Sequence, residues 1–149
     1  MRIENDILIP ELERLLKQQK EVRFTPSGVS MRPFIEGDRD SVILTALTRP
    51  PRLGDILLVR LAAENRSYVL HRLVRFDRNG AGETLLVLQG DGNITGEEIC
   101  RETDIIGLVK TIERPNGRCK WMTRGRIWYH LRPFRSFLLK IYRHTLLKI

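Results

Sequence analysis

The segment Tyr68-Val69-Leu70-His71-Arg72-Leu73-Val74 has the side-chain alternation of a β-strand. A period of two directs Val69, His71 and Leu73 to one face of the strand and the residues between them to the other. His71 therefore shares a face with apolar side chains, which would exclude water from its ring and restrict its rotamer. A core histidine bonded to a backbone carbonyl has the same pattern, so this strand alone leaves the role of His71 open.

Four further short runs rich in Val, Ile and Leu lie on either side of this strand along the chain. They cover residues 41–47, 55–61, 84–89 and 105–112. The segments between the runs contain Pro, Gly, Asn and Asp, which are turn-forming residues. Runs of this length and spacing predict a mostly β fold, an antiparallel sheet curled into a partial barrel.

Two helices are predicted outside the strand region. Leucines recur at helical spacing over about residues 5–21, which indicates a short amphipathic N-terminal helix. Apolar residues at intervals of three and four, with basic residues between them, predict a second helix over residues 126–149, bent or restarted at Pro133. We expect residues 1–113 to form one domain that includes the first helix, and residues 114–149 to form a basic amphipathic extension.

The composition is that of a folded protein with a strongly basic tail. The 149 residues suit a single domain and carry a net charge of +8. All 18 acidic residues lie at or before Glu113, and 10 of the 26 basic residues follow it. The two cysteines, Cys100 and Cys119, are too few for a disulfide framework or a four-ligand zinc site, and we expect unpaired thiols with no metal and no other cofactor.

The N-terminal residues do not have the pattern of a secretory leader. Acidic residues stand where such a leader would be basic, and the chain contains no run of 18 apolar residues. We therefore expect a cytoplasmic protein, either free or attached peripherally at the inner face of the membrane.

A second segment, Ser27-Gly28-Val29-Ser30-Met31-Arg32-Pro33, places a serine in a glycine-containing bend beside a proline. A serine hydroxyl attacks poorly until a neighbouring base takes its proton. No lysine occurs between Lys20 and Lys110, and His71 is the only histidine outside the tail. If Ser30 is a nucleophile, His71 is its base; the alternative is a turn serine bonded to its own backbone.

The acid that would orient His71 is less sharply indicated. Asp91 lies in Gly90-Asp91-Gly92-Asn93, just past a predicted strand, and is the preferred candidate. Asp104 and Glu97 are the alternatives, and an ordinary turn aspartate is the competing interpretation of Asp91.

Four segments follow one another along the chain: the serine segment extended through Gly37-Asp38, then Gly54-Asp55-Ile56-Leu57-Leu58-Val59, then Tyr68-Val69-Leu70-His71-Arg72, and finally Gly90-Asp91-Gly92-Asn93 with Gly107-Leu108-Val109. Taken in this order, they resemble the sequence boxes of the type I signal peptidases and their repressor-peptidase relatives, over about residues 24–112. The histidine before Arg72 resembles the pattern of the endoplasmic-reticulum and archaeal branch, which uses histidine in place of lysine.

This resemblance implies a mostly β serine endopeptidase that cleaves beside small side chains. It implies that Ser30 is the nucleophile and His71 the general base. It further implies that the Ser30 backbone N–H holds the oxyanion with help from the Ser27 hydroxyl, and that Met31 belongs to the substrate pocket. A leader or signal-like peptide is the expected substrate.

The chain departs from this family in three places. The membrane-spanning helix that normally precedes the serine box is replaced by a charged segment, residues 11–17. Phe34 stands where a threonine is usual, and Gly96-Glu97-Glu98 stands where an aspartate pair is usual. A catalytically silent module on the same fold, which binds a peptide or a membrane surface, is therefore the alternative function.

The basic tail allows two interpretations. A cationic helix that starts at Trp128 and Tyr129 can lie among anionic lipid headgroups and provide a peripheral membrane contact. Alternatively, Leu131, Phe134, Leu138 and Ile141 pack on the sheet or on a partner, with the basic residues in water. We expect no nucleic-acid partner, because the tail shows no helix-turn-helix pair.

Overall fold

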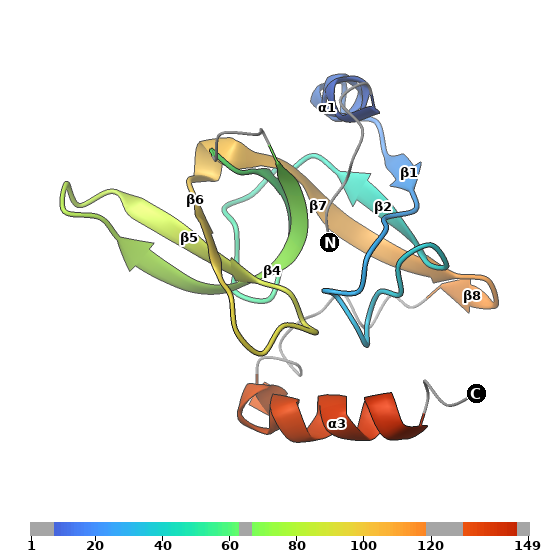
Figure 1. Cartoon of the computed structure of the whole chain (residues 1–149). Coiled ribbons are helices and arrows are strands. Elements are labelled where there is room, and N and C mark those ends of the chain that lie inside the picture. The colour runs from blue at the N-terminus through green and yellow to red at the C-terminus, as the bar shows by residue number, and fades with distance from the viewer. Residues whose placement is uncertain (1–7, 63–66, 119–129, 146–149) are drawn as a thin grey trace.

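The protein is built on one open antiparallel sheet of eight strands (Figure 1). The computed structural model describes residues 8–62, 67–118 and 130–145. The strands lie side by side in the order β1-β2-β7-β3-β4-β5-β6, and β8 pairs with β7. Their bounds are Val22–Phe24 (β1), Ser41–Thr45 (β2), Ile56–Arg60 (β3), Tyr68–Arg78 (β4), Thr84–Gln89 (β5), Glu98–Cys100 (β6), Ile105–Arg114 (β7) and Gly117–Arg118 (β8).

The prediction of a mostly β, antiparallel fold is confirmed, and the sheet is not closed into a barrel. The five predicted runs correspond to β2, β3, β4, β5 and β7. Strands β1, β6 and β8 were not predicted, because two or three residues show too little alternation to be recognised. The sheet also continues through β8, past the domain boundary expected after residue 113.

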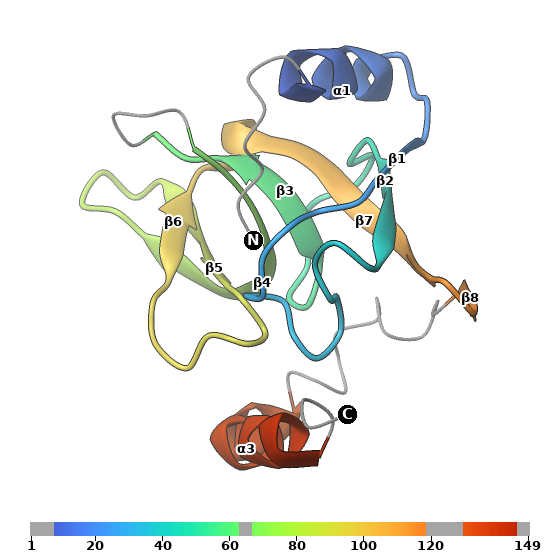
Figure 2. The same ribbon diagram turned by 45° about the vertical axis from the view of Figure 1, so that its right-hand side comes forward.

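Helix α1 (Leu8–Lys17) covers one side of the sheet, as Figures 1 and 2 both show. It buries Ile9, Leu12 and Leu16, at the i, i+3 and i+7 positions of one helical face. A 3₁₀ turn over Arg132–Phe134 contains Pro133, and α3 (Arg135–Thr145) starts afresh after it. The remainder of the predicted second helix, with Trp128 and Tyr129, lies outside the described residues. None of the described helices has the length and apolar character needed to cross a bilayer.

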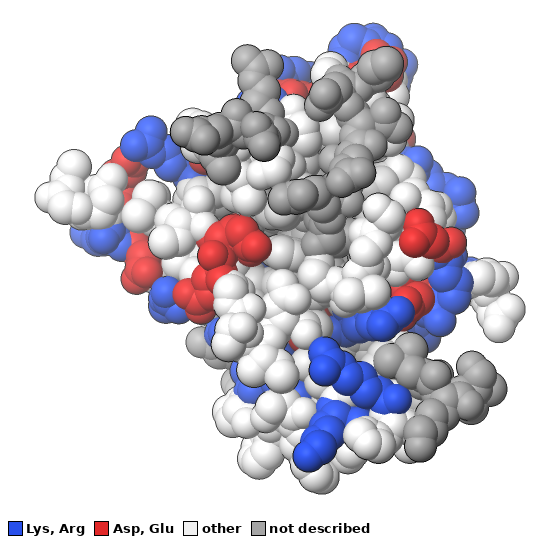
Figure 3. Space-filling view, viewed as in Figure 1, with Lys and Arg blue, Asp and Glu red and all other residues white. Residues whose placement is uncertain are grey.

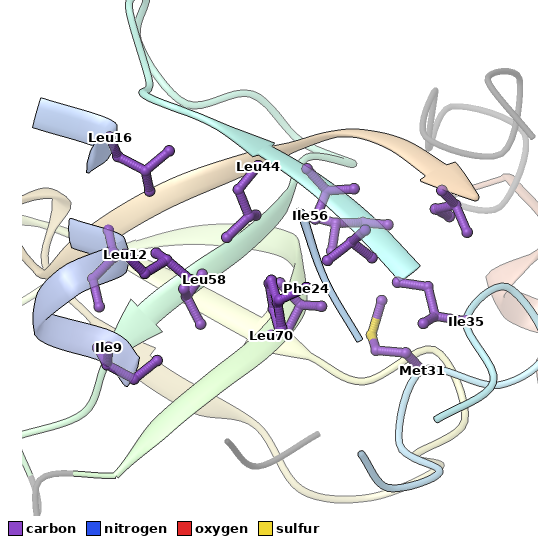
Figure 4. Close-up of a cluster of buried hydrophobic side chains, with 14 residues drawn as sticks. Ile9, Leu12, Leu16, Phe24, Met31, Ile35, Leu44, Ile56, Leu58 and Leu70 are labelled. Carbon is purple, nitrogen blue, oxygen red and sulfur yellow. The ribbon is translucent and has the colours of Figure 1, made fainter. Parts of the chain in front are cut away.

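Buried apolar side chains form two clusters, divided by the alternation of the central strands. The first cluster joins α1 to side chains of β1, β2, β3 and β7 and of the serine loop (Figure 4). The second cluster contains Leu57, Val59, Val69, Leu73, Leu86, Leu88 and Cys100. Leu70 belongs to the first cluster, whereas Val69 and Leu73 belong to the second, as the alternation in β4 predicts. Each fully buried leucine contributes about 1.5–3 kcal/mol through the hydrophobic effect.

Helix α3 does not turn the predicted apolar face toward the sheet. Leu139 and Arg135 are the residues buried on the body, whereas Phe134 is 63% exposed and Ile141 is 45% exposed. Leu131, Phe134 and Ile141 therefore do not pack on the sheet, and Leu138 is half-buried. The alternative that this face packs on a partner stays a prediction. The helix is oriented instead by hydrogen bonds of Arg135, described below, which a pattern of apolar residues does not reveal.

Candidate active site

The loop between β1 and β2 positions Ser30 through a close contact between two turns. Gly28 has a φ of +96°, which L side chains rarely adopt. A side chain on Gly37 would place its Cβ only 2.1 Å from the Gly28 carbonyl oxygen. The Asp38 N–H donates to the Pro26 carbonyl at 2.8 Å and closes the loop. The two glycines of the serine segment are thus needed for the two turns to touch.

The loop between β5 and β6 holds Ser30 from the other side. The Gly92 N–H donates to the Ser30 carbonyl at 2.8 Å. A Cβ on Gly90 would lie 2.4 Å from that same carbonyl oxygen and 3.1 Å from His71 Nε2. Only glycine leaves room for the serine loop and the imidazole ring at this point.

Ser30 and His71 meet directly in the structure. Ser30 Oγ lies 3.0 Å from His71 Nε2, and His71 Nδ1 lies 2.7 Å from Glu98 Oε2. An ionised carboxylate can only accept, so Nδ1 carries the proton and Nε2 presents a lone pair to the serine hydroxyl. His71 is 2% exposed, and Ser30 is partly exposed. A buried imidazole in the correct tautomer therefore stands behind an accessible hydroxyl.

Glu98 is ionised at neutral pH and held beside the imidazole. Burial alone would raise the pKa of Glu98, but the hydrogen bond from His71 and the attraction of that ring outweigh it, so the pKa lies below its ordinary value. The carboxylate therefore remains charged as the pH falls into the mildly acidic range. It can fix the orientation of the ring and stabilise the imidazolium that forms when His71 takes a proton.

Strand register explains why Glu98 reaches the histidine. Glu98 pairs with Leu88, and Leu73 pairs with Leu88 on the other side of β5. Side chains opposite one another across a sheet share a face, and residues two apart along a strand do so as well. Glu98 and His71 therefore lie on the face that carries the second core cluster.

The prediction that Asp91 orients His71 requires correction. Asp91 is 2% exposed and accepts two hydrogen bonds from Arg72, each 2.7 Å long. Of the alternatives, Glu97 accepts hydrogen bonds from Arg75, and Asp104 accepts the Arg101 N–H. Glu98 was missed because the Glu98–Cys100 strand is too short to recognise. With β6 assigned to Glu98–Cys100, the alternation of side chains places Glu98 on the face of His71 and the preceding Glu97 off that face.

Arg72 forms a buried polar centre beneath the site. Besides Asp91, its Nη1 donates to the Gly54 carbonyl at 2.8 Å. Its guanidinium carbon lies 5.3 Å from the centroid of the Phe34 ring, within the range of a cation–π contact. Phe34 therefore packs on the arginine that follows His71.

The two residues expected around the substrate lie in different environments. Met31 is fully buried in the first core cluster, so its side chain anchors the serine loop to the core and is not an exposed pocket wall. Ser27 is exposed three residues before Ser30. A contribution of Ser27 to the oxyanion remains a prediction.

Helix α3 connects the two loops that bracket Ser30. Arg132 and Arg135 both donate to Gln89 Oε1, at 2.9 and 2.8 Å, and Arg135 also donates to the Ile94 carbonyl. Tyr142 donates to Glu36 at 3.4 Å. Burial lowers the pKa of Arg135, and repulsion from Arg132 lowers it further. The helix thus contacts the serine loop and the β5–β6 loop together.

The arrangement offers nucleophilic catalysis by the serine. A hydroxyl, an imidazole and a carboxylate stand in series within hydrogen-bond distance, the chain of contacts used for acyl transfer. Burial raises the pKa of Cys100 to about 12, so this thiol is not a competing nucleophile at neutral pH.

A scan against protein-family models found no match to this chain, and a search of curated proteins found none either.

The first test of the site is the substitution Glu98→Gln. A neutral amide can hold the other tautomer of His71 and cannot stabilise the imidazolium, so we expect kcat to fall about 10²- to 10⁴-fold. Glu97→Gln removes a carboxylate one residue away that contacts Arg75, and we expect it to change kcat less than about threefold. Equal losses in the two variants would exclude a specific role for Glu98, and Glu98→Asp should recover part of the activity.

Proposed function

We propose that this protein is a serine endopeptidase that acts through an acyl-enzyme. The Ser30 hydroxyl attacks the carbonyl carbon of the scissile peptide bond while His71 Nε2 takes its proton. His71 then gives that proton to the leaving amine, and water hydrolyses the ester with His71 again as the base. Glu98 keeps the ring in place throughout.

The observation that carries this proposal is the Ser30–His71–Glu98 series. Ser30 and His71 are 41 residues apart in the sequence, yet their side chains lie at 3.0 Å. The resemblance of the four sequence segments to signal peptidases supports the same chemistry. By the same resemblance, we propose a leader or signal-like peptide with small side chains beside the cleaved bond as the substrate class.

Labelling with a fluorophosphonate probe tests the proposal without knowledge of the substrate. We expect the probe to label the wild-type protein at Ser30 and to leave Ser30→Ala unlabelled. Ser136→Ala, an exposed serine on α3, is the matched control and should be labelled like the wild type. Labelling of Ser30→Ala at the wild-type rate, or no labelling of the wild type, would reject the enzyme in favour of a silent peptide- or membrane-binding module.

We further propose that the outer face of α3 lies on anionic membrane. Phe134, Phe137 and Ile141 are 63%, 64% and 45% exposed, at the spacing of one helical face. Lys140 and Arg143 are also exposed on this helix, and the chain carries no acidic residue after Glu113. An apolar ridge on a helix whose own charged residues are all basic fits the headgroup layer of an acidic bilayer. The peptidase would then work at the inner face of the membrane.

Vesicle co-sedimentation tests this contact. We expect the protein to sediment with vesicles that contain phosphatidylglycerol, and binding to fall at least about tenfold in Phe134→Glu/Phe137→Glu, which puts charge into the apolar ridge. Thr84→Glu/Ile99→Glu, two exposed positions away from α3, adds the same charge and should retain binding. Binding that persists in the α3 variant, or that is equal on neutral vesicles, would contradict the proposal.

A further inference from the structure

Four arginines line an open hollow on the flank of the sheet near β8. Figure 3 shows Lys and Arg atoms gathered on this flank, with acidic atoms between them. The hollow has a volume of ≈ 420 Å³. Its charged and polar lining consists of Arg23, Arg39, Arg114 and Arg118, with Ser41 and Glu113. It lies outside the Ser30–His71–Glu98 series and has no part in the chemistry described above.

Strand register places this hollow on the solvent side of the sheet. Arg23 pairs with Ile43, and Ser41 pairs with Glu113. Ser41 and Ile43 are two residues apart on β2, so their partners Arg23 and Glu113 share their face. The opposite face carries Phe24, Val42 and Ile112 of the first core cluster. Arg118 pairs with Glu113, so Arg23 and Arg118 are both placed by the same alternation that fills the core.

Positive charge exceeds negative charge in the hollow. Glu113 pairs with Arg23 at 2.7 Å and with Arg118 at 3.2 Å. Asp40 pairs with Arg39 at 2.7 Å and lies 3.9 Å from Arg114. Among the residues that the structure describes here, four guanidiniums therefore face two carboxylates, a balance of 4 − 2 = +2.

Hydrogen-bonding capacity shows the same excess. Each guanidinium has five N–H donors, whereas the Glu113 carboxylate that Arg23 and Arg118 share offers two oxygens. Asp40 is further engaged by the Glu36 N–H at 2.8 Å. The hydrogen bond from Arg23 lowers the pKa of Glu113, partly opposed by desolvation, and the charges of Arg23 and Arg118 lower it further. The hollow thus has both charge and donors to offer an anionic ligand.

We infer that this hollow binds acidic side chains of the peptide substrate, an inference that rests on the proposed peptidase function. Arg23 lies on β1, and the chain runs from it directly into the serine loop. Ser30 is seven positions after Arg23, and an extended chain spans at most ~3.6 Å per residue, so the two sites lie within ~25 Å. The acidic residues then fall within about seven residues of the cleaved bond.

A peptide fits the hollow better than a compact anion such as phosphate. The arginines come from β1, from the 31–40 loop and from the β7–β8 hairpin, so they surround the hollow from several sides. In an extended peptide, alternate side chains lie on one face about 6.6–7 Å apart. Two glutamates at that spacing can each engage a different guanidinium, in the forked geometry that arginine prefers for carboxylates.

Fluorescence polarisation with an inactive protein tests the inference independently of catalysis. The full chain carrying Ser30→Ala is titrated into a rhodamine-labelled peptide that contains Glu-Ala-Glu-Ala-Glu, and into the matched peptide with Gln in place of Glu. We expect the Glu peptide to bind at least about tenfold more tightly at low salt, and to lose that advantage at high salt. Equal binding of the two peptides would overturn the inference.

Charge-removing variants locate the binding. Arg23→Gln/Arg118→Gln should weaken the Glu peptide about tenfold or more. The control Arg14→Gln/Arg101→Gln removes two other exposed arginines, each also paired with a glutamate, and should leave binding within about twofold. Equal losses in both doubles would show a general charge effect and reject the hollow as a site. Tighter binding of inorganic phosphate than of the Glu peptide would reject a peptide as its ligand.

The two proposals fail separately. If the wild-type protein is not labelled by the fluorophosphonate but still binds the Glu peptide in an Arg23-dependent manner, the peptidase proposal is rejected and the acidic-peptide site is retained. If Ser30 is labelled but the Glu and Gln peptides bind equally well, the peptidase proposal is retained and the hollow is rejected as a peptide site.

Discussion

His71→Ala is expected to reduce the rate of peptide hydrolysis, and of fluorophosphonate labelling at Ser30, by roughly 10⁴- to 10⁶-fold. The substitution removes the group that takes the serine proton, whose Nε2 lies 3.0 Å from Ser30 Oγ. The wild-type rate should fall as the pH is lowered, because only the neutral imidazole accepts a proton. The measurement is the second-order rate constant for labelling as a function of pH.

His144→Ala is the control for this loss. His144 is an exposed histidine near the end of α3. Its Nδ1 donates to the Lys140 carbonyl at 3.0 Å, within the same helix. We expect wild-type labelling in this variant. Circular dichroism should show that His71→Ala retains the β-sheet signal. A folded His71→Ala protein that labels within tenfold of the wild-type rate would contradict a role for His71 as the base.

Asp91→Ala is expected to lower the free energy of unfolding by about 3–5 kcal/mol. Arg72 is 1% exposed and Asp91 is 2% exposed, so removal of the carboxylate leaves a buried guanidinium without its counter-charge. That loss is large because a charge out of water is costly unless it is paired. Urea denaturation followed by far-UV circular dichroism measures the change.

Two further variants make this stability prediction specific. Glu97→Ala breaks an exposed pair with Arg75 and should cost less than about 1 kcal/mol. If Asp91→Ala is too unstable to purify, Arg72→Met/Asp91→Leu removes both charges and should fold better than the single variant. A cost for Asp91→Ala no greater than that for Glu97→Ala would show that the buried pair has little effect on stability.

The sheet could be predicted where strands are long enough to show alternation. β4 has 11 residues and separates Leu70 from Val69 and Leu73 by parity alone. β6 has three residues, and its glutamate was therefore not placed on the histidine's face. Strand length thus limited the prediction of the site as well as that of the fold, because Glu98 lies on β6, a strand that was not predicted.

The site residues were predictable only where residue type restricts the choice. His71 was the only base of its kind in the body of the chain, so its pairing with Ser30 could be predicted. The chain has 18 acidic residues, and composition cannot select one of them. Asp91 lies in a turn just after a strand. It pairs with Arg72, which is one residue after His71 and therefore lies on the opposite face of β4. The orientation of α3 was hidden for a related reason, since Arg135 and Gln89 meet 46 residues apart.

Ser30 and His71 are supported by different hydrophobic clusters. Met31 and Ile35 fix the serine loop to the cluster beneath α1, whereas the imidazole shares a face with Leu73, Leu88 and Cys100. The distance between the hydroxyl and the imidazole therefore depends on side-chain packing on both faces of the central strands. Under the proposed function, a large-to-small substitution in either cluster is expected to lower both the stability and the rate of acyl transfer, although it touches none of the reacting groups.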